Sequence, residues 1–137
     1  MPEAEIKLDN LSKCLEEAYL LYFNTRKDIK LNLIKPENDI YFHFDTLQIS
    51  RCFSNLIKNA IEAVEKIPNP VVEVLLATDD KNIKIEIKDN GVGIDEKMLS
   101  KIFEPYFTTK TKGTGLGLSI VKRIIEDHGG KIKIEKN

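Results

Sequence analysis

Apolar residues recur every three or four positions in several stretches of the chain, which predicts helices that bury one face. The first stretch follows Asp9, the expected helix cap, and its apolar positions are Leu11, Cys14, Leu15, Ala18, Leu21 and Tyr22. A second helix is predicted over residues 45–67, because Asp45 and Gln48 have the spacing of a capping box and Pro68 ends the pattern. The remaining predicted helices cover residues 95–102 and, before the stop signal Gly129-Gly130, residues 115–128.

Between these helices, apolar and polar residues alternate in short runs bounded by turn residues, as in β-strands. These runs occupy residues 30–34, 39–44, 71–77, 82–88 and 131–135. Residues 78–81 join two runs into a predicted hairpin, and residues 103–113, with proline, threonine and glycine, are predicted as a mobile loop. The order of elements predicts an α+β fold, a two-layer sandwich in which about three helices cover one face of a mixed, mostly antiparallel sheet.

Composition is typical of a single globular domain. The 137 residues are 42% hydrophobic and 31% charged, with a formal net charge of −1. The charges form no long run of one sign, which argues against a nucleic-acid or anionic-membrane surface. No apolar stretch approaches the roughly 18 residues of a membrane span. We therefore expect a cytoplasmic domain, with any membrane attachment in other segments of the protein.

Cysteine and histidine usage argues against a zinc site. Cys14 and Cys52 lie in helical patterns without a CxxC partner, so we expect both to be buried as small apolar residues in a reducing setting. His43 and His128 show no ligand spacing with the cysteines.

The helix predicted over residues 45–67 has a polar face that suits a metal ion. At about 100° per residue, its apolar positions gather on one side, and a group within about 60° lies opposite: Asn55, Asn59, Glu62 and Lys66. Asparagine is a mediocre helix former, and its amide oxygen is a hard ligand of the kind that Mg²⁺ prefers. From this helix alone, a plain solvated face is the alternative.

Two glycine-containing segments suit a nucleotide. Asp89-Asn90-Gly91-Val92-Gly93 follows a predicted strand, where a carboxylate can accept a hydrogen bond from an exocyclic amine and glycine lets a ligand approach. A simple turn is the alternative for this segment. Lys112-Gly113-Thr114-Gly115-Leu116-Gly117-Leu118 leads into a helix whose N-terminal N–H groups favour a phosphate. A hinge is the alternative here, and the segment matches neither a Walker loop nor a Rossmann fingerprint.

Taken in this order and spacing, the segments resemble the ATP-binding fold shared by histidine kinases, gyrase-type ATPases, Hsp90 chaperones and mismatch-repair ATPases. Asn55–Ala63 looks like the N box of that family, and Asp89–Ile94 looks like its first glycine box. Ile102–Lys110 looks like the F box, in a form most similar to nitrogen-regulation-type sensor kinases, and Gly113–Leu118 looks like the second glycine box. The resemblance implies that residues 1–137 are the catalytic ATP-binding domain of a sensor histidine kinase, without its dimerisation and phosphoacceptor domain.

The resemblance also implies a role for individual residues. Asn59 would bind Mg²⁺, Asn55 would bind the metal or the phosphates, and Asp89 would bind the adenine amine. Lys110 would reach the terminal phosphates, with a solvated loop lysine as the alternative. The other implied nucleotide-binding residues are Gly91, Gly93, Ile94, Gly113, Thr114, Gly115, Leu116, Gly117 and Leu118. Phe103 and Phe107 are expected to be either lid anchors or core residues.

The same comparison favours phosphoryl transfer to a protein over ATP hydrolysis. Gyrase-type relatives have a glutamate as general base four residues before the metal-binding asparagine. Asn55 occupies that position here, and Glu62 is the only reserve candidate on the same face. Neither His43, in a predicted strand, nor His128, for which we expect a structural role at a helix end, looks like a phosphoacceptor. The chain should therefore bind ATP without phosphorylating itself on histidine.

Partners and boundaries follow from the resemblance as well. The implied partners are Mg-ATP, the phosphoacceptor domain of the same kinase and, indirectly, a response regulator. The isolated domain should be a monomer, which sedimentation at two concentrations would test. Because the family continues with a further hairpin and strand after the segment Lys131–Glu135, a trimmed C-terminus is expected. The alternatives are an anti-sigma-factor-type serine kinase of the same fold and a degenerate module that docks a partner without nucleotide.

Overall fold

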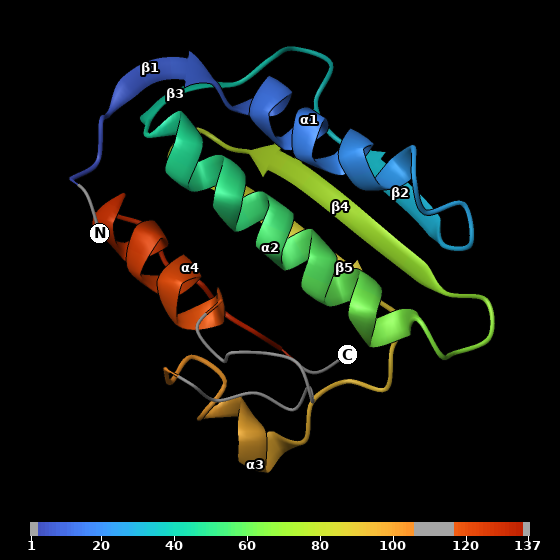
Figure 1. Ribbon diagram of the computed structural model, residues 1–137. Helices are drawn as coiled ribbons and strands as arrows, with labels where there is room; N and C mark the ends of the chain where they lie inside the picture. Colours follow the sequence, from blue (N-terminus) through green and yellow to red (C-terminus); the bar gives the residue numbers. More distant parts are fainter. Residues whose placement is uncertain (1–2, 106–116, 136–137) are drawn as a thin grey trace. The chain divides into compact units, whose positions relative to one another are not determined.

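The computed structural model describes residues 3–105 and 117–135, and the chain forms two compact units, residues 1–92 and residues 93–137. The first unit contains all of the strands among the described residues (Figure 1). Its elements are β1 (Lys7–Asn10), α1 (Leu11–Phe23), β2 (Lys30–Ile34), β3 (Tyr41–Phe44), α2 (Thr46–Val64), β4 (Val71–Thr78) and β5 (Ile83–Asp89).

The strands of the first unit form two sheets rather than the single sheet that the sequence suggests. β1 and β3 pair antiparallel, and β2, β4 and β5 form a mixed sheet with β4 in the middle. β2 runs parallel to β4, whereas β5 returns antiparallel as the second strand of the predicted hairpin. In this register Val72 lies between Leu31 on β2 and Asp89 on β5.

Helices α1 and α2 lie side by side over one face of the three-stranded sheet (Figure 1). The alternation along β4 explains this layer, because Val72, Val74 and Leu76 are fully buried whereas the residues between them are half-buried. α2 buries an apolar stripe at helical spacing, of which Ile57 is completely inaccessible to solvent. The predicted two-layer α+β architecture is therefore confirmed for this unit.

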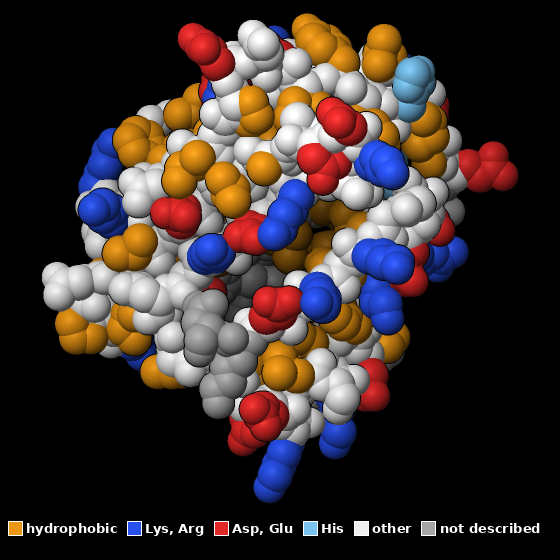
Figure 2. All heavy atoms as spheres, turned by 180° about the vertical axis from the view of Figure 1, so that it is seen from behind, with side chains coloured by type: hydrophobic (Ala, Val, Ile, Leu, Met, Phe, Trp, Pro, Cys, Tyr) orange, Lys and Arg blue, Asp and Glu red, His pale blue; other side chains and the backbone are white. Residues whose placement is uncertain are grey.

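The other face of the sheet is more polar. On β5 the ammonium groups of Lys84 and Lys88 lie 2.7 Å and 3.3 Å from the carboxylate of Glu86, which holds the pKa of Glu86 below its usual range. Figure 2 shows the molecule from behind, with acidic and basic side chains interspersed among hydrophobic ones. On this view the charged side chains of the described residues are mixed in sign, in keeping with the net charge of −1.

The second unit contains α3 (Glu96–Leu99) and α4 (Gly117–Asp127). Asp95 caps α3 by accepting a hydrogen bond from the backbone N–H of Lys97. α4 ends at Asp127, one residue before the predicted end, and Gly129 just beyond it has a φ of +79°, a conformation that glycine adopts without steric cost. His128 donates a hydrogen bond from Nδ1 to the carbonyl of Ile124 over 2.7 Å, which supports the expected structural role. Within the described parts of the chain, no helix is long and apolar enough to cross a membrane.

Several predicted boundaries are wrong for reasons that lie in the tertiary structure. Asn10, not Asp9, caps α1 by accepting from the N–H of Lys13 at 2.9 Å, because residues 7–10 form the unpredicted strand β1. Asp9 instead accepts from the Thr46 hydroxyl and from the N–H of Asn10. α2 ends at Val64 rather than near residue 67, so Lys66 lies beyond the helix whose polar face it was expected to share.

The predicted strand at residues 131–135 is also wrong, since the structure assigns no strand there. Ile132 and Ile134 do alternate with lysines, and both are half-buried. Alternation is required for a half-buried strand, but a strand also needs a neighbour that pairs with its backbone. The predicted helix at residues 95–102 likewise shortens to the four residues of α3.

Candidate functional site

The two asparagines of interest lie one turn apart on α2, at positions that are half-buried. By helical spacing Asn55 and Asn59 lie opposite the buried Ile57 and Val64, as the sequence suggested, but buried Cys52 and Gln48 lie on the same side of the helix one and two turns earlier. Their partial burial departs from a plain solvated face. The side chains offer two amide oxygens, four residues apart, on a helix that the sheet holds in place.

The segment after β5 comes into contact with this helix. Asp89 is the last residue of β5, is half-buried, and accepts a hydrogen bond at Oδ1 from the N–H of Gly91 over 2.9 Å. A Cβ at position 91 would lie 2.6 Å from the backbone oxygen of Ala63 on α2 and 3.0 Å from Asp89 Oδ1. No side chain fits there, so glycine is required for the close approach between the two segments.

Asn90, to which the sequence assigned no role, binds the backbone where the turn after α2 leads into β4. Its Oδ1 accepts from the N–H of Val71 at 2.8 Å, and its Nδ2 donates to the carbonyl of Asn69 at 2.9 Å. The backbone N–H of Asn90 also donates to the carbonyl of Val71 at 3.2 Å. The signal was available in principle, because asparagine in a turn commonly bonds to backbone groups, but the sequence does not say which ones.

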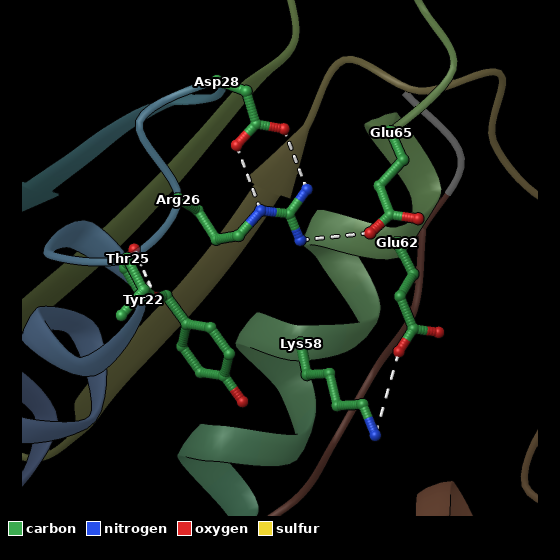
Figure 3. A network of polar contacts seen from close by, with 7 residues as sticks. All are labelled: Tyr22, Thr25, Arg26, Asp28, Lys58, Glu62 and Glu65. Atoms are coloured by element: carbon green, nitrogen blue, oxygen red, sulfur yellow. Dashed lines mark hydrogen bonds and ion pairs between the residues drawn. The ribbon is translucent and has the colours of Figure 1, made fainter.

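Glu62, the reserve candidate for a general base, is half-buried and lies 3.9 Å from the ammonium of Lys58 one turn earlier (Figure 3). The pKa of the Tyr22 hydroxyl is raised mainly by burial, and the negative charge of Glu62 raises it further. Glu62 is therefore engaged with residues of the first unit, in keeping with an ordinary helix-surface glutamate.

The candidate residues of the second unit are only partly described. Gly93 is exposed with a φ of +81°, and Ile94 is half-buried. Gly117 and Leu118 are half-buried at the start of α4. Six candidates lie outside the described residues: Phe107, Lys110, Gly113, Thr114, Gly115 and Leu116. Of the predicted lid aromatics, Phe103 is half-buried with the ammonium of Lys122 5.4 Å from its ring centre, a cation–π contact.

A shallow hollow in the first unit lies elsewhere. It is at the turn of the β4–β5 hairpin, lined by Ala77, Thr78, Asp79, Asn82, Ile83 and Lys84. Asp79 already accepts from the N–H groups of Lys81 and Asn82, both at 2.8 Å, so its carboxylate organises the turn. Asp89 is at the opposite end of β5, and the hollow takes no part in the candidate site.

Comparison with known proteins supports the resemblance seen in the sequence. Residues 44–137 match the family model described as "Histidine kinase-, DNA gyrase B-, and HSP90-like ATPase". Sporulation kinase A of Bacillus subtilis is 41% identical over 131 residues, which are 93% of this chain and 21% of that protein. Nitrogen regulation protein NtrY of Azorhizobium caulinodans is 41% identical over 96 residues, 66% of this chain and 12% of that protein. The chain thus spans about a fifth of the first relative and less of the second.

Solved structures of histidine kinase ThkA have the same fold. Its nucleotide-free catalytic domain is 34% identical, with a TM-score of 0.87 over 97% of this chain and 88% of that one. ThkA in complex with the response regulator protein TrrA is 30% identical, with a TM-score of 0.81 over 96% of this chain and 38% of that one. The fold therefore matches that of a kinase catalytic domain over almost the whole chain.

Proposed function

Since the chain belongs to the histidine kinase-, DNA gyrase B- and HSP90-like ATPase family, we propose that it binds Mg-ATP and donates the γ-phosphoryl group to a histidine on a separate dimerisation domain. The whole protein would then be a sensor kinase of a two-component system. The relatives whose names point this way are much longer than this chain, so the proposal concerns the protein of which this domain is a part.

The observation that carries the proposal is the contact between Gly91 and α2. A Cβ at position 91 would clash with the backbone oxygen of Ala63 and lie very close to the carboxylate of Asp89. The segment after β5 therefore lies too close to α2 for any residue other than glycine. Asp89 lies at a strand end with its Oδ1 on the Gly91 N–H, and it is a suitable acceptor for the exocyclic amine of adenine. The loop would form the floor under the base.

The metal would be held by amide oxygens. Asn59 and Asn55 are hard oxygen donors on one half-buried helix face, a donor set that suits Mg²⁺ together with water and phosphate oxygens. When bound, Mg²⁺ neutralises charge on the phosphates. Further nucleotide contacts are proposed for the residues that the family resemblance implies: Gly93, Ile94, Lys110, Gly113, Thr114, Gly115, Leu116, Gly117 and Leu118.

The residues of the N box support transfer of the phosphoryl group to a protein rather than hydrolysis of ATP. The position of the gyrase-type general base is held by Asn55, and Glu62 is ion-paired with Lys58. The acceptor is expected within a dimerisation helix, and neither histidine of the chain lies within a helix. His43 is on β3, and His128 follows the end of α4 with its Nδ1 hydrogen-bonded to the carbonyl of Ile124. The acceptor is therefore assigned to another domain, with a response regulator downstream as in the relative that was solved in complex with one.

We expect the wild-type domain to bind Mg-ATP and Asp89→Asn to bind it at least about 10-fold more weakly, because a charge-assisted hydrogen bond contributes about 1.5–3 kcal/mol. Isothermal titration calorimetry measures both. Guanine presents a carbonyl where adenine presents its amine, so the substitution should also narrow the preference for ATP over GTP.

The matched control is Asp80→Asn, which makes the same charge change on an exposed residue of the β4–β5 turn. It should bind ATP as the wild type does. Lack of wild-type binding at millimolar Mg-ATP, or equal affinity of Asp89→Asn and the wild type, would refute the proposed adenine site.

A further inference from the structure

Three connections of the first unit meet at one end of the three-stranded sheet: the α1–β2 connection, the α2–β4 connection and the segment after β5. The N–H of Lys30, where β2 begins, donates to the carbonyl of Pro70 at 3.0 Å. Asn90 bonds to Asn69 of the same α2–β4 connection and to Val71, the first residue of β4. The backbone after α2 is therefore held between the first connection and the candidate nucleotide loop.

Arg26, in the α1–β2 connection, forms ion pairs with Asp28 of the same connection and with Glu65 at the end of α2 (Figure 3). Its guanidinium donates from Nε and Nη2 to the two carboxylate oxygens of Asp28, at 3.1 Å and 2.9 Å, and from Nη1 to Oε1 of Glu65 at 3.1 Å. The two parallel hydrogen bonds to Asp28 fix the plane of the guanidinium. The orientation of its third hydrogen bond, to Glu65, is therefore fixed as well. The hydrogen bond from Arg26 holds the pKa of Asp28 below its usual range, consistent with a formed pair.

The backbone of Arg26 is itself anchored to α1. Its N–H donates to the carbonyl of Tyr22 at 2.7 Å, and the hydroxyl of Thr25 bonds to the carbonyl of Leu21 at 2.9 Å. The side chain therefore projects from the end of α1 to Glu65, the C-terminal cap residue of α2 (Figure 3). A carboxylate at a helix C-terminus is unfavourable beside the helix dipole, and the guanidinium offsets that charge.

Glu65 is two residues from the point where α2 meets the nucleotide loop. The carbonyl of Ala63 is the group against which Gly91 rests, and the N–H of Ile67 bonds back to the carbonyl of Val64 at 3.2 Å, continuing the turn. This last turn of α2 thus has Arg26 bonded to its cap residue, Gly91 against its carbonyl and Asn90 bonded to the chain just beyond it. A shift of the turn moves the surface on which Gly91 lies.

We propose that Arg26 is a positioning residue of the nucleotide site: through Glu65 it holds the last turn of α2, against which Gly91 rests, and so sets where the Asp89 carboxylate meets the base. The inference rests on the proposed function. An exposed ion pair by itself contributes little to stability. Loss of the Arg26–Glu65 contact should therefore weaken ligand binding and change the environment of Gly91, while the domain remains folded.

The experiment compares Arg26→Ala, Glu65→Gln and the double variant with the wild type, by calorimetry with Mg-ATP at a temperature where urea titration shows every variant folded. Arg26→Ala should bind about 3-fold to 10-fold more weakly, which lies within the range of indirect coupling through packed elements. The double variant should lose no more than Arg26→Ala, because both changes remove the same contact. Arg26→Lys should recover part of the affinity.

The Gly91 amide resonance of the nucleotide-free protein gives a second readout. It should shift in Arg26→Ala and Glu65→Gln but not in the control Lys35→Ala. Lys35 pairs with Glu16 at 3.3 Å, and the exposures of these side chains (27% and 43%) match those of Arg26 and Glu65 (31% and 43%). Lys35 follows β2 at the end opposite to the three connections. Lys35→Ala should bind ATP normally.

Wild-type affinity in Arg26→Ala, or losses in affinity that add in the double variant, would overturn the inference. If the wild-type domain failed to bind Mg-ATP, the proposed function would fail instead. The Gly91 resonance would then still show whether Arg26 acts on the loop, and an unchanged resonance in Arg26→Ala would overturn the inference independently.

Discussion

Asp89, Asn90 and Gly91 are adjacent in sequence, yet each performs a different task. Asp89 presents a half-buried carboxylate, Asn90 bonds to backbone groups 19 and 21 residues earlier, and Gly91 provides the space for α2 to approach. The nucleotide-binding role of Asp89 stays a prediction from residue type and from the resemblance to the family. At Gly91 the sequence predicted the approach of a ligand, whereas the structure places the backbone of α2 there. The contacts of Asn90 were not predicted, because its partners Val71 and Asn69 are brought to it only by the pairing of β4 with β5.

At residue 91, alanine should destabilise the first unit by about 1–3 kcal/mol, the usual cost of inserting a methyl group into packed surroundings. The clash is with backbone, the oxygen of Ala63, which cannot move without shifting α2. Urea denaturation measures the change, and the same variant should bind Mg-ATP more weakly. Gly130→Ala is the matched control, because a Cβ there would lie 3.1 Å from Cγ2 of Ile125 and 3.4 Å from its backbone oxygen, both longer than the 2.6 Å contact at residue 91. Equal stability of the two variants would contradict this explanation.

Among the elements, α2 has the largest role, because it carries the two candidate metal ligands and forms the layer over β4 and β5. Its start is secured by Asp45, which accepts from the N–H of Gln48 at 3.0 Å and from the N–H of Glu5 at 2.7 Å. The first bond is the predicted cap. The second was not predicted, because it depends on β1 pairing with β3 and bringing Glu5 to the helix.

Replacement of Asp45 by alanine should cost about 1–2 kcal/mol of unfolding free energy, the typical range for loss of a helix N-cap. Asp45→Asn keeps one acceptor oxygen for Gln48 but places an amide group where Glu5 donates, so its loss should be smaller. Urea titration at neutral pH distinguishes the two. If Asp45→Ala were as stable as the wild type, the cap would contribute nothing, and if the two variants were equal, the bond to Glu5 would be the dominant contact.

For the molecule as a whole, the helices bury both cysteines against the interior. Cys14 on α1 is 6% exposed and Cys52 on α2 is 1% exposed, which confirms their expected apolar role. Burial raises the pKa of the Cys14 thiol from 9.0 to about 11, with smaller contributions from Asp9 and Glu17, and raises that of Cys52 to about 12. The folded protein therefore holds both thiols neutral at a pH where the unfolded chain ionises them.

Stability should therefore fall as the pH rises above 9, since the unfolded state then releases protons that the folded state retains until about pH 11 and 12. At pH 10 the loss should be about 1 kcal/mol for each thiol. Urea titrations at pH 7 and pH 10 under reducing conditions measure it. Cys52→Ala should lose less stability between these two pH values than the wild type, and an equal loss would show that Cys52 contributes nothing to it.

The sequence by itself determined the features that depend on local spacing. These are the helical stripe of α2, its cap at Asp45, the β4–β5 hairpin, the glycine stop after α4 and the polar face with Asn55 and Asn59. Such features need only neighbours within a turn or a strand. The four motifs, in order from Asn55–Ala63 to Gly113–Leu118, were enough to indicate the family.

Only the tertiary structure decided the contacts between segments distant in the sequence. It made residues 7–10 a strand and moved the α1 cap to Asn10, and it left residues 131–135 without the strand that their alternation suggests. It also joined Arg26 to Glu65 and Asn90 to the α2–β4 connection. Each outcome depends on a backbone or a charge that another segment supplies, and a sequence pattern does not specify which segment that is.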